Sequence, residues 1–79
     1  YLVYIIRSVN FPKKFYTGFS KNIIERLNYH NKGNSTHTKK FKPWEVIYYC
    51  AFKNKQRALE FEKYLKTASG IAFRNKRLI

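Results

Sequence analysis

Two tyrosines on adjacent predicted strands are the first residues whose type and spacing suggest chemistry. Apolar and polar residues alternate on both sides of the segment 10–13, which predicts two strands joined as a hairpin. If the turn is centred near Asn10, Tyr4 and Tyr16 lie opposite each other and project from one face of the sheet. Gly18 would leave backbone room beside the two phenols. A slip of one residue would place the phenols on opposite faces.

Arg26 and His30 are four residues apart in a predicted helix that begins at an Asn22 cap and runs to about Lys32. Its apolar stripe consists of Ile23, Ile24 and Leu27. The spacing places the guanidinium next to the imidazole, along the edge of this stripe and facing the sheet. A guanidinium can stabilise the transition-state charge of a phosphate, and an imidazole can act as a base. The structural alternatives are a surface arginine and a histidine that complements the helix dipole.

The two tyrosines are alternatives to His30 as the base of a hydrolytic reaction. A phenol titrates near a pH of about 10 and is a poor base at neutral pH. In surroundings with this many cations, however, we expect its phenolate to be favoured. Tyr4 and Tyr16 could equally be ordinary amphipathic strand residues. No Ser-His-Asp arrangement is readable and the only thiol, Cys50, lies in an apolar run, so a covalent mechanism is not expected.

Glu62 is the carboxylate best placed for a functional role. It borders the apolar stripe of a second predicted helix, 54–66, whereas Glu60 points toward solvent. A carboxylate at the buried edge of a helix is costly unless a cation lies beside it. That cation can be a basic side chain in an ion pair or a metal ion. Because the chain has only four carboxylates, all Glu, it can supply one Mg²⁺ or Mn²⁺ site but not a two-metal centre.

The net charge of the chain favours a polyanionic partner. Seventeen Lys and Arg residues face four Glu residues, which gives +13 over 79 residues. Nucleic acid is the expected partner because the basic residues are interleaved with aromatic ones, and a membrane surface is the weaker alternative. No apolar run approaches the roughly 20 residues of a membrane span. A single cysteine excludes an internal disulfide, so we expect a reducing cytoplasm.

The polar, basic segment 34–43 carries hydroxyls, amides and lysines that can hold phosphates without reading sequence. We expect phosphate contacts from five residues, Lys21, Thr38, Lys39, Lys40 and Lys42. For the individual residues Thr36, His37 and Thr38, a solvated connector is an equally plausible interpretation.

The remaining pattern predicts one small α+β domain over residues 1–79. Strands are expected at 2–8, 14–19 and 45–52, of which the first is central and covered on both faces. Helices are expected at 22–32 and 54–66, with Gly33 as a left-handed stop, followed by a helical segment at 71–79. The expected fold is a three-stranded antiparallel sheet packed with two to three helices. Because the chain contains no Met, we expect that it lacks its start.

These features together resemble the GIY-YIG nuclease family. Val3-Tyr4-Ile5 on the first strand and Tyr16-Thr17-Gly18 on the second are similar to the two motifs that name the family. Val3 stands where the family often has Gly, and Thr17 replaces the central Ile of the second motif. The order of the later elements also matches, so the resemblance covers almost the whole chain.

The resemblance implies a metal-dependent endonuclease that hydrolyses phosphodiester bonds in DNA. In this interpretation Tyr4 takes the proton of the attacking water, His30 polarises Tyr4, and Tyr16 positions phosphate or water. Arg26 stabilises the charge on the phosphate. Glu62 follows Ala58-Leu59 as the family's metal ligand does, which favours the metal over the ion pair.

Asn75 lies where many members of the family have an asparagine near the active site. Similarity to the nuclease modules of excision-repair subunits and of structure-specific resolvases implies specificity for backbone structure, in a repair or recombination setting. The alternative is a nucleic-acid-binding protein without turnover that uses the same basic face. RNA is the alternative substrate.

Overall fold

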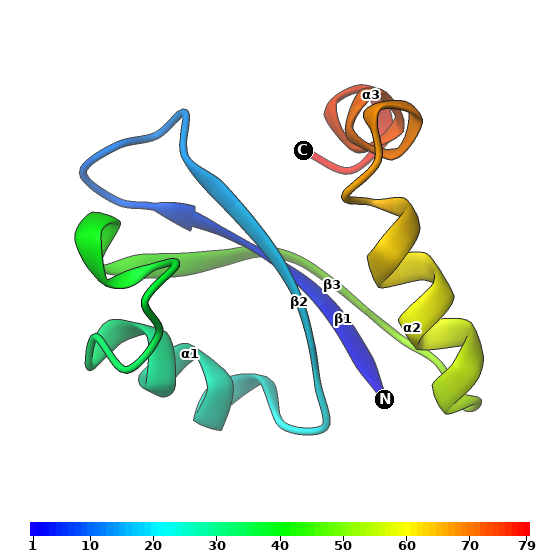
Figure 1. The fold of residues 1–79 in the computed structure, drawn as a ribbon, viewed down its shortest axis with the longest axis horizontal. Coiled ribbons are helices and arrows are strands. Elements are labelled where there is room, and N and C mark those ends of the chain that lie inside the picture. Colours follow the sequence, from blue (N-terminus) through cyan, green and yellow to red (C-terminus); the bar gives the residue numbers. More distant parts are fainter.

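The computed structural model describes all 79 residues and contains one sheet and three helices. Strands β1 (Leu2–Ser8), β2 (Phe15–Ser20) and β3 (Trp44–Ala51) form an antiparallel sheet in the order β2-β1-β3. The helices are α1 (Ile23–Asn31), α2 (Lys55–Tyr64) and α3 (Ala68–Arg77), and a short 3-10 turn covers Lys39–Phe41 (Figure 1). The predicted α+β fold class is confirmed. None of the three helices has the length and hydropathy needed to cross a bilayer.

The central strand β1 is buried on both faces, as predicted. Val3 and Ile5 pack with Ala58 and Leu65 on the side of α2 and α3, which Figure 1 shows on one side of the sheet. The opposite face carries Tyr4, Ile6 and Trp44 and is covered by α1 and the 3-10 turn. Burial of each large aliphatic side chain contributes about 1.5–3 kcal/mol, so this strand anchors both layers.

The hairpin register differs from the prediction. Tyr4 pairs with Gly18, and Tyr16 pairs with Ile6, so the register is symmetrical about Phe11, one residue later than expected. The predicted direct pairing of the two tyrosines is therefore wrong. The two phenols nevertheless remain on one face of the sheet, as diagonal neighbours, because the pairing has moved by two positions along β2.

The hydrogen bonds of Ser8 explain this register. Its amide donates to the carbonyl of Lys14 at 3.0 Å, and its hydroxyl accepts from the amide of Phe11 at 3.0 Å. The same hydroxyl donates to the carbonyl of Phe41 at 2.6 Å, which ties the turn to the distant 3-10 segment. The turn is thus positioned by a buried side chain rather than by the strand pattern alone.

Helix α1 begins and ends as predicted. The Asn22 side chain accepts a hydrogen bond from the amide of Glu25, and Gly33 has the left-handed φ of 77°. The predicted apolar stripe is wrong at Ile24, which is 72% exposed, while Ile23 and Leu27 pack under the sheet. Ile23 and Leu27 are four residues apart and share a helix face, whereas Ile24, the residue after Ile23, points away from that face.

Candidate active site

Five of the predicted site residues line one cleft at the outer edge of β2. The cleft has a volume of about 370 Å³ and receives side chains from both strands of the hairpin, from α1, from the segment 34–43 and from α2. The predicted residues in its lining are Tyr4, Tyr16, Arg26, His30 and Glu62. Because β2 is an edge strand, side chains from helices on opposite faces of the sheet can meet around it.

Gly18 makes room for the Tyr4 ring in this cleft. A Cβ atom at Gly18 would lie 2.5 Å from Cζ and 2.9 Å from Cε1 of Tyr4, and closer still to its hydroxyl. No such contact is tolerated between real atoms, so the phenol can lie across the β2 backbone only because residue 18 has no side chain.

A buried chain of hydrogen bonds joins Tyr4, His30 and Thr38. The Tyr4 hydroxyl lies 2.8 Å from Nε2 of His30, and Nδ1 of His30 lies 2.7 Å from Oγ1 of Thr38. All three residues are at most 2% exposed. The Trp44 indole donates to the Thr38 carbonyl at 2.8 Å and so fixes Thr38, the last residue of this series of hydrogen bonds. The imidazole is therefore fixed in orientation from both sides.

The structure corrects the predicted role of Thr38. Its hydroxyl is directed into the protein and bonded to His30, so it is not presented to a phosphate. The segment looked like an open loop in the sequence, but its 3-10 turn folds against α1 and buries this residue. The four predicted phosphate-binding lysines are exposed and lie outside the cleft lining: Lys21, Lys39, Lys40 and Lys42.

Burial controls the protonation of the tyrosine–histidine pair. It raises the pKa of Tyr4 well above the ordinary 10.0, Tyr16 raises it further, and the opposing effect of Arg26 is smaller. Burial also lowers the pKa of His30 below 6.5, and the charge of Arg26 adds to this. At neutral pH Tyr4 is therefore a phenol and His30 a neutral imidazole. The prediction that nearby cations favour the phenolate is wrong here, because desolvation outweighs their charge.

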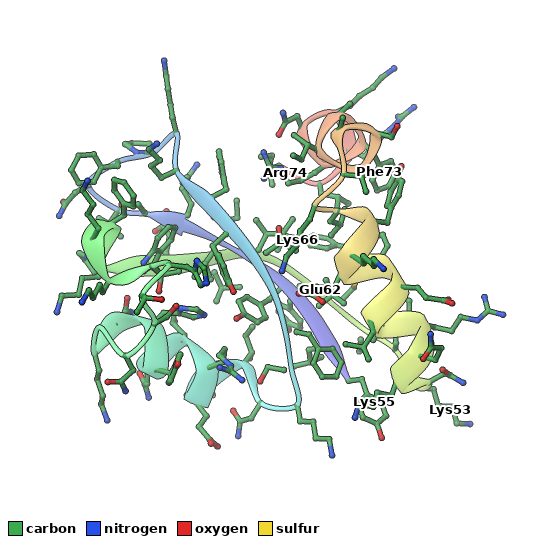
Figure 2. All side chains as sticks on the ribbon, viewed as in Figure 1. Lys53, Lys55, Glu62, Lys66, Phe73 and Arg74 are labelled. Atoms are coloured by element: carbon green, nitrogen blue, oxygen red, sulfur yellow. The ribbon has the colours of Figure 1, made fainter.

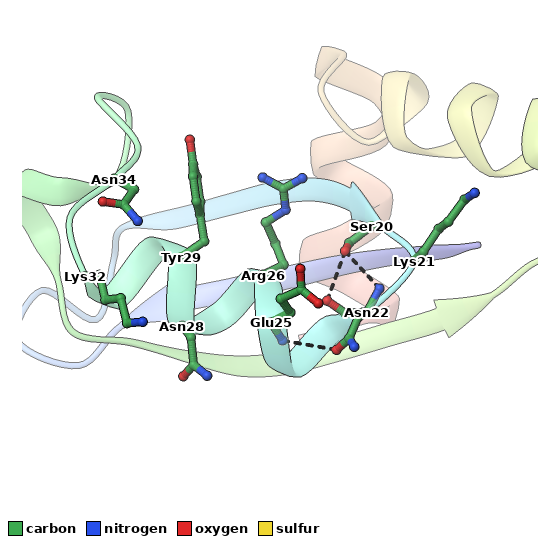
Figure 3. Close-up of a pocket in the computed structure, with 9 residues that line it drawn as sticks. All are labelled: Ser20, Lys21, Asn22, Glu25, Arg26, Asn28, Tyr29, Lys32 and Asn34. Carbon is green, nitrogen blue, oxygen red and sulfur yellow. Dashed lines mark hydrogen bonds between the residues drawn. The ribbon is translucent and has the colours of Figure 1, made fainter.

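Arg26 lies where the cleft meets a second, larger groove. The groove has a volume of about 600 Å³ and runs along α1, and its lining includes Lys21 and Lys32 (Figure 3). Figure 3 shows Arg26 and Tyr29 projecting side by side from α1, with the guanidinium 4.9 Å from the centre of the Tyr29 ring. Neither of the two ion pairs in the protein involves Arg26. Its charge is thus free to meet an anion in the cleft.

Glu62 lines the cleft and is also in an ion pair. Its Oε2 accepts from Nζ of Lys66 at 2.7 Å, and the side chain is only 19% exposed. Figure 2 shows Glu62 projecting from α2, and Lys66 from the turn after it, toward β2. Its Oε1 makes no hydrogen bond within the protein. The residue pattern allows an ion pair or a metal ligand, and the resemblance favours the metal. The ion pair with Lys66 is present, and the free Oε1 leaves the carboxylate able to bind a metal as well. Lys66 could have been anticipated from its spacing of four residues.

The donor set of the cleft fits one hard divalent cation. Glu62 is the only carboxylate in the lining, and no group of three His, Cys, Asp or Glu side chains converges in the chain. Mg²⁺ commonly uses one or two carboxylates and completes its shell with water and phosphate oxygens. A two-metal centre would need more acidic side chains than this cleft provides.

Asn75 is the predicted active-site residue that the structure does not bring to the cleft. It is exposed on α3, and its Oδ1 accepts from Nε and Nη2 of Arg74 at 3.1 and 2.9 Å. Helix α3 begins at Ala68, three residues earlier than predicted, because the Thr67 hydroxyl caps it by accepting from the Gly70 amide. Sequence reasoning also missed Tyr29 and His37 in the cleft lining. The spacing of three residues between Arg26 and Tyr29 is a signal for Tyr29, whereas no local pattern identifies His37.

The fold and the cleft define a class of small α+β domain that combines a buried tyrosine–histidine pair, a free guanidinium and one carboxylate. The family model described as the GIY-YIG catalytic domain matches residues 1–76. The chain therefore belongs to the GIY-YIG family.

Three relatives share the name of one endonuclease subunit. "Structure-specific endonuclease subunit SLX1" of Debaryomyces hansenii is 44% identical over 75 residues, which cover 84% of this chain and 21% of that protein. The protein of the same name from Kluyveromyces lactis is 35% identical, covering 78% of this chain and 24% of that protein. The SLX1 homolog of Giardia intestinalis is 32% identical, covering 73% and 17%. The chain thus spans about a fifth of the length of these relatives. No solved structure matches the chain.

Proposed function

We propose that this chain is a nuclease domain that hydrolyses phosphodiester bonds in DNA with one divalent metal ion, Mg²⁺ or Mn²⁺. The observation that carries the proposal is the convergence of Tyr4, Tyr16, Arg26, His30 and Glu62 on one cleft. The net charge of +13 and the word endonuclease in the names of the relatives support a nucleic acid as the substrate, and the resemblance to repair and resolvase nuclease modules favours DNA. The same proposal includes recognition of DNA structure, a repair or recombination setting and a reducing cytoplasm. The free thiol of Cys50 favours the reducing compartment.

Tyr4 and His30 act together as the proton acceptor in this proposal. Neutral His30 accepts the hydroxyl proton of Tyr4 at Nε2, while its Nδ1–H donates to Thr38. As the proton moves to the imidazole, the Tyr4 oxygen takes a proton from the attacking water. The raised pKa of Tyr4 disfavours a standing phenolate, and it makes the oxygen a strong base at the moment of transfer.

Arg26 and Tyr16 act on the phosphate. The unpaired guanidinium of Arg26 stabilises the negative charge that develops on the phosphate oxygens. The Tyr16 ring lies 5.2 Å from the His30 ring and 5.6 Å from the Lys66 ammonium, where its hydroxyl can orient water or phosphate. Glu62 would hold the metal ion, which supplies Lewis-acid stabilisation of the same oxygens when bound.

The test compares Glu62→Gln with Glu60→Gln. Both substitutions remove one charge from α2, but Glu60 is exposed and lies outside the cleft. Cleavage of branched, nicked and single-stranded DNA is measured with Mg²⁺ or Mn²⁺. We expect Glu62→Gln to reduce kcat at least about 100-fold while DNA binding is retained, and Glu60→Gln to cleave like the wild type.

Failure of the wild type to cleave any of these substrates, together with salt-sensitive binding, would show a nucleic-acid-binding protein without turnover. The same assays on RNA of matched structure decide between the two polymers. Preferential cleavage of RNA would contradict the assignment of DNA.

A further inference from the structure

A second cavity lies directly beside the catalytic cleft and is not used by the proposed chemistry. It has a volume of about 390 Å³ and lies between β2, the segment 34–43 and the junction of α2 with α3. It shares Tyr16 and His37 with the cleft. Lys66, which holds Glu62 in the cleft, also lines this cavity. We call it the Arg74 pocket, after the arginine that α3 contributes to its lining.

The Arg74 pocket is basic and contains an arginine without an acidic partner. Its titratable lining residues beside Tyr16 are His37, Lys66 and Arg74, and no carboxylate is among its lining residues. The half-buried Arg74 guanidinium belongs to neither of the two ion pairs and bonds only to the neutral amide of Asn75. Its burial also lowers its pKa. A partly desolvated charge of this kind is costly until an anion joins it.

Aromatic rings stand beside these cations. The Arg74 guanidinium lies 4.8 Å from the centre of the Phe15 ring, and the Lys66 ammonium lies 5.6 Å from that of Tyr16. Figure 2 shows Arg74 projecting toward β2 from α3, and Lys66 from the turn between α2 and α3. Cations that bind phosphate beside flat apolar rings that contact sugar or base are the features by which proteins hold a nucleic-acid strand without reading its sequence.

We propose that the Arg74 pocket binds a nucleotide next to the scissile phosphate, with its phosphate on Arg74 and its sugar or base against Phe15. The location rests on the proposed function, because a strand whose phosphate occupies the cleft passes Tyr16 and His37 to enter the pocket. The groove along α1 is the other exit from the cleft, but Glu25 lines it. A strand leaving through the Arg74 pocket meets no carboxylate.

The first test measures DNA binding by two charge-matched variants. Arg74→Gln removes the pocket cation, whereas Arg77→Gln removes an exposed cation from the same helix that lines no cavity. Both are made in a Tyr4→Phe background, so that turnover does not interfere, and fluorescence anisotropy with a nicked duplex is recorded over a range of salt. We expect Arg74→Gln to weaken binding about tenfold and to reduce the salt slope by about 1, and Arg77→Gln to weaken binding at most about twofold.

Arg74→Lys separates charge from stacking. It should retain part of the affinity, because the charge remains while the contact with Phe15 is lost. Circular dichroism spectra and unfolding midpoints of all variants check that α3 is still folded. Equal weakening by Arg74→Gln and Arg77→Gln in folded proteins would overturn the proposal.

The second test locates the nucleotide. Single methylphosphonates, which remove one phosphate charge at a time, are placed along the cleaved strand, and their effect on binding is compared with and without Arg74. At one position adjacent to the cleaved bond, the methylphosphonate and the loss of Arg74 together should cost less affinity than the sum of the two single changes. At every other position the two effects should add. Additivity at every position would overturn the pocket while leaving the nuclease function intact. Coupling in a wild-type protein that cleaves nothing would instead leave the pocket as a strand-binding site and refute the proposed function.

Discussion

His30 is held between two hydroxyl groups, and this decides what each of them can do. When Thr38 accepts from Nδ1–H, Nε2 is left with a lone pair directed at the Tyr4 hydroxyl, which is the arrangement that the proposed proton transfer needs. If the histidine had the other tautomer, Tyr4 would only accept from it. Thr38 is thus a positioning residue that acts through His30, although the sequence suggested a phosphate contact.

Replacement of Thr38 tests this role. Thr38→Val has nearly the same shape but no hydroxyl, so Nδ1 of His30 loses its partner. We expect kcat to fall about 10- to 100-fold with little change in KM, because Thr38 does not touch the substrate. Steady-state kinetics on a nicked duplex measure both constants.

Thr38→Ser is the control, since it retains the hydroxyl and should recover most of kcat. Wild-type kcat in Thr38→Val would show that the hydroxyl has only a structural role. A rise in KM without loss of kcat would show a substrate contact instead. Burial of an unpaired Nδ1 also predicts a stability loss of about 1–3 kcal/mol in the valine variant, which denaturant unfolding measures.

At the scale of elements, the sequence predicted what local chemistry determines. The Asn22 cap, the Gly33 stop and the two strands of the hairpin depend on neighbours within a few residues, and all three are found. The hairpin register instead depends on the hydroxyl of Ser8, whose partner at Phe41 is 33 residues away. No local pattern reports such a contact.

The candidate site shows the same division between local and distant effects. The spacing of Arg26 and His30 and the position of Glu62 on its helix follow from helix geometry alone. The burial of Thr38 depends on how the segment 34–43 packs, and so does the pKa of Tyr4, which desolvation raises against the effect of Arg26. These could not be anticipated because desolvation is a property of the assembled fold.

Gly18 links the pairing of β1 with β2 to the catalytic cleft, because it pairs with Tyr4 and leaves room for the Tyr4 ring. In Gly18→Ala the new methyl group meets the Tyr4 ring, which is buried and bonded to His30 and so has little freedom to move. We expect the variant to lose about 1–3 kcal/mol of folding free energy and most of its nuclease activity. Urea unfolding and cleavage rates measure the two effects.

Gly33→Ala is the matched control for this substitution. Gly33 has a φ of 77°, so alanine there is also destabilising, by roughly 1 kcal/mol. It lines neither the cleft nor the Arg74 pocket, so activity should survive in the fraction that is folded. Equal losses of activity in the two variants, once corrected for folding, would contradict a specific role for Gly18 beneath Tyr4.

The whole molecule is organised as a basic body around one edge of its sheet. The groove along α1, the cleft and the Arg74 pocket follow one another and share lining residues at each junction. Only two ion pairs form, Arg7–Glu45 and Lys66–Glu62, so fifteen of the seventeen Lys and Arg residues have no acidic partner. The domain measures only 29 × 25 × 18 Å, which is within about one Debye length at low salt. The unpaired positive charges therefore repel one another across the whole molecule.

Salt should therefore have opposite effects on the free protein and on its complex with DNA. Added salt screens the repulsion and should raise the Tm of the free protein, while it weakens DNA binding through the loss of counterion release. At low salt, DNA at about 100 times its Kd should stabilise the protein by about 2.7 kcal/mol, and this gain should disappear as salt is added. Scanning calorimetry with and without DNA, over a series of salt concentrations, measures both trends. An uncharged peptide nucleic acid of the same sequence is the control, and equal stabilisation by it, or a Tm of the free protein that falls with salt, would contradict an electrostatic origin.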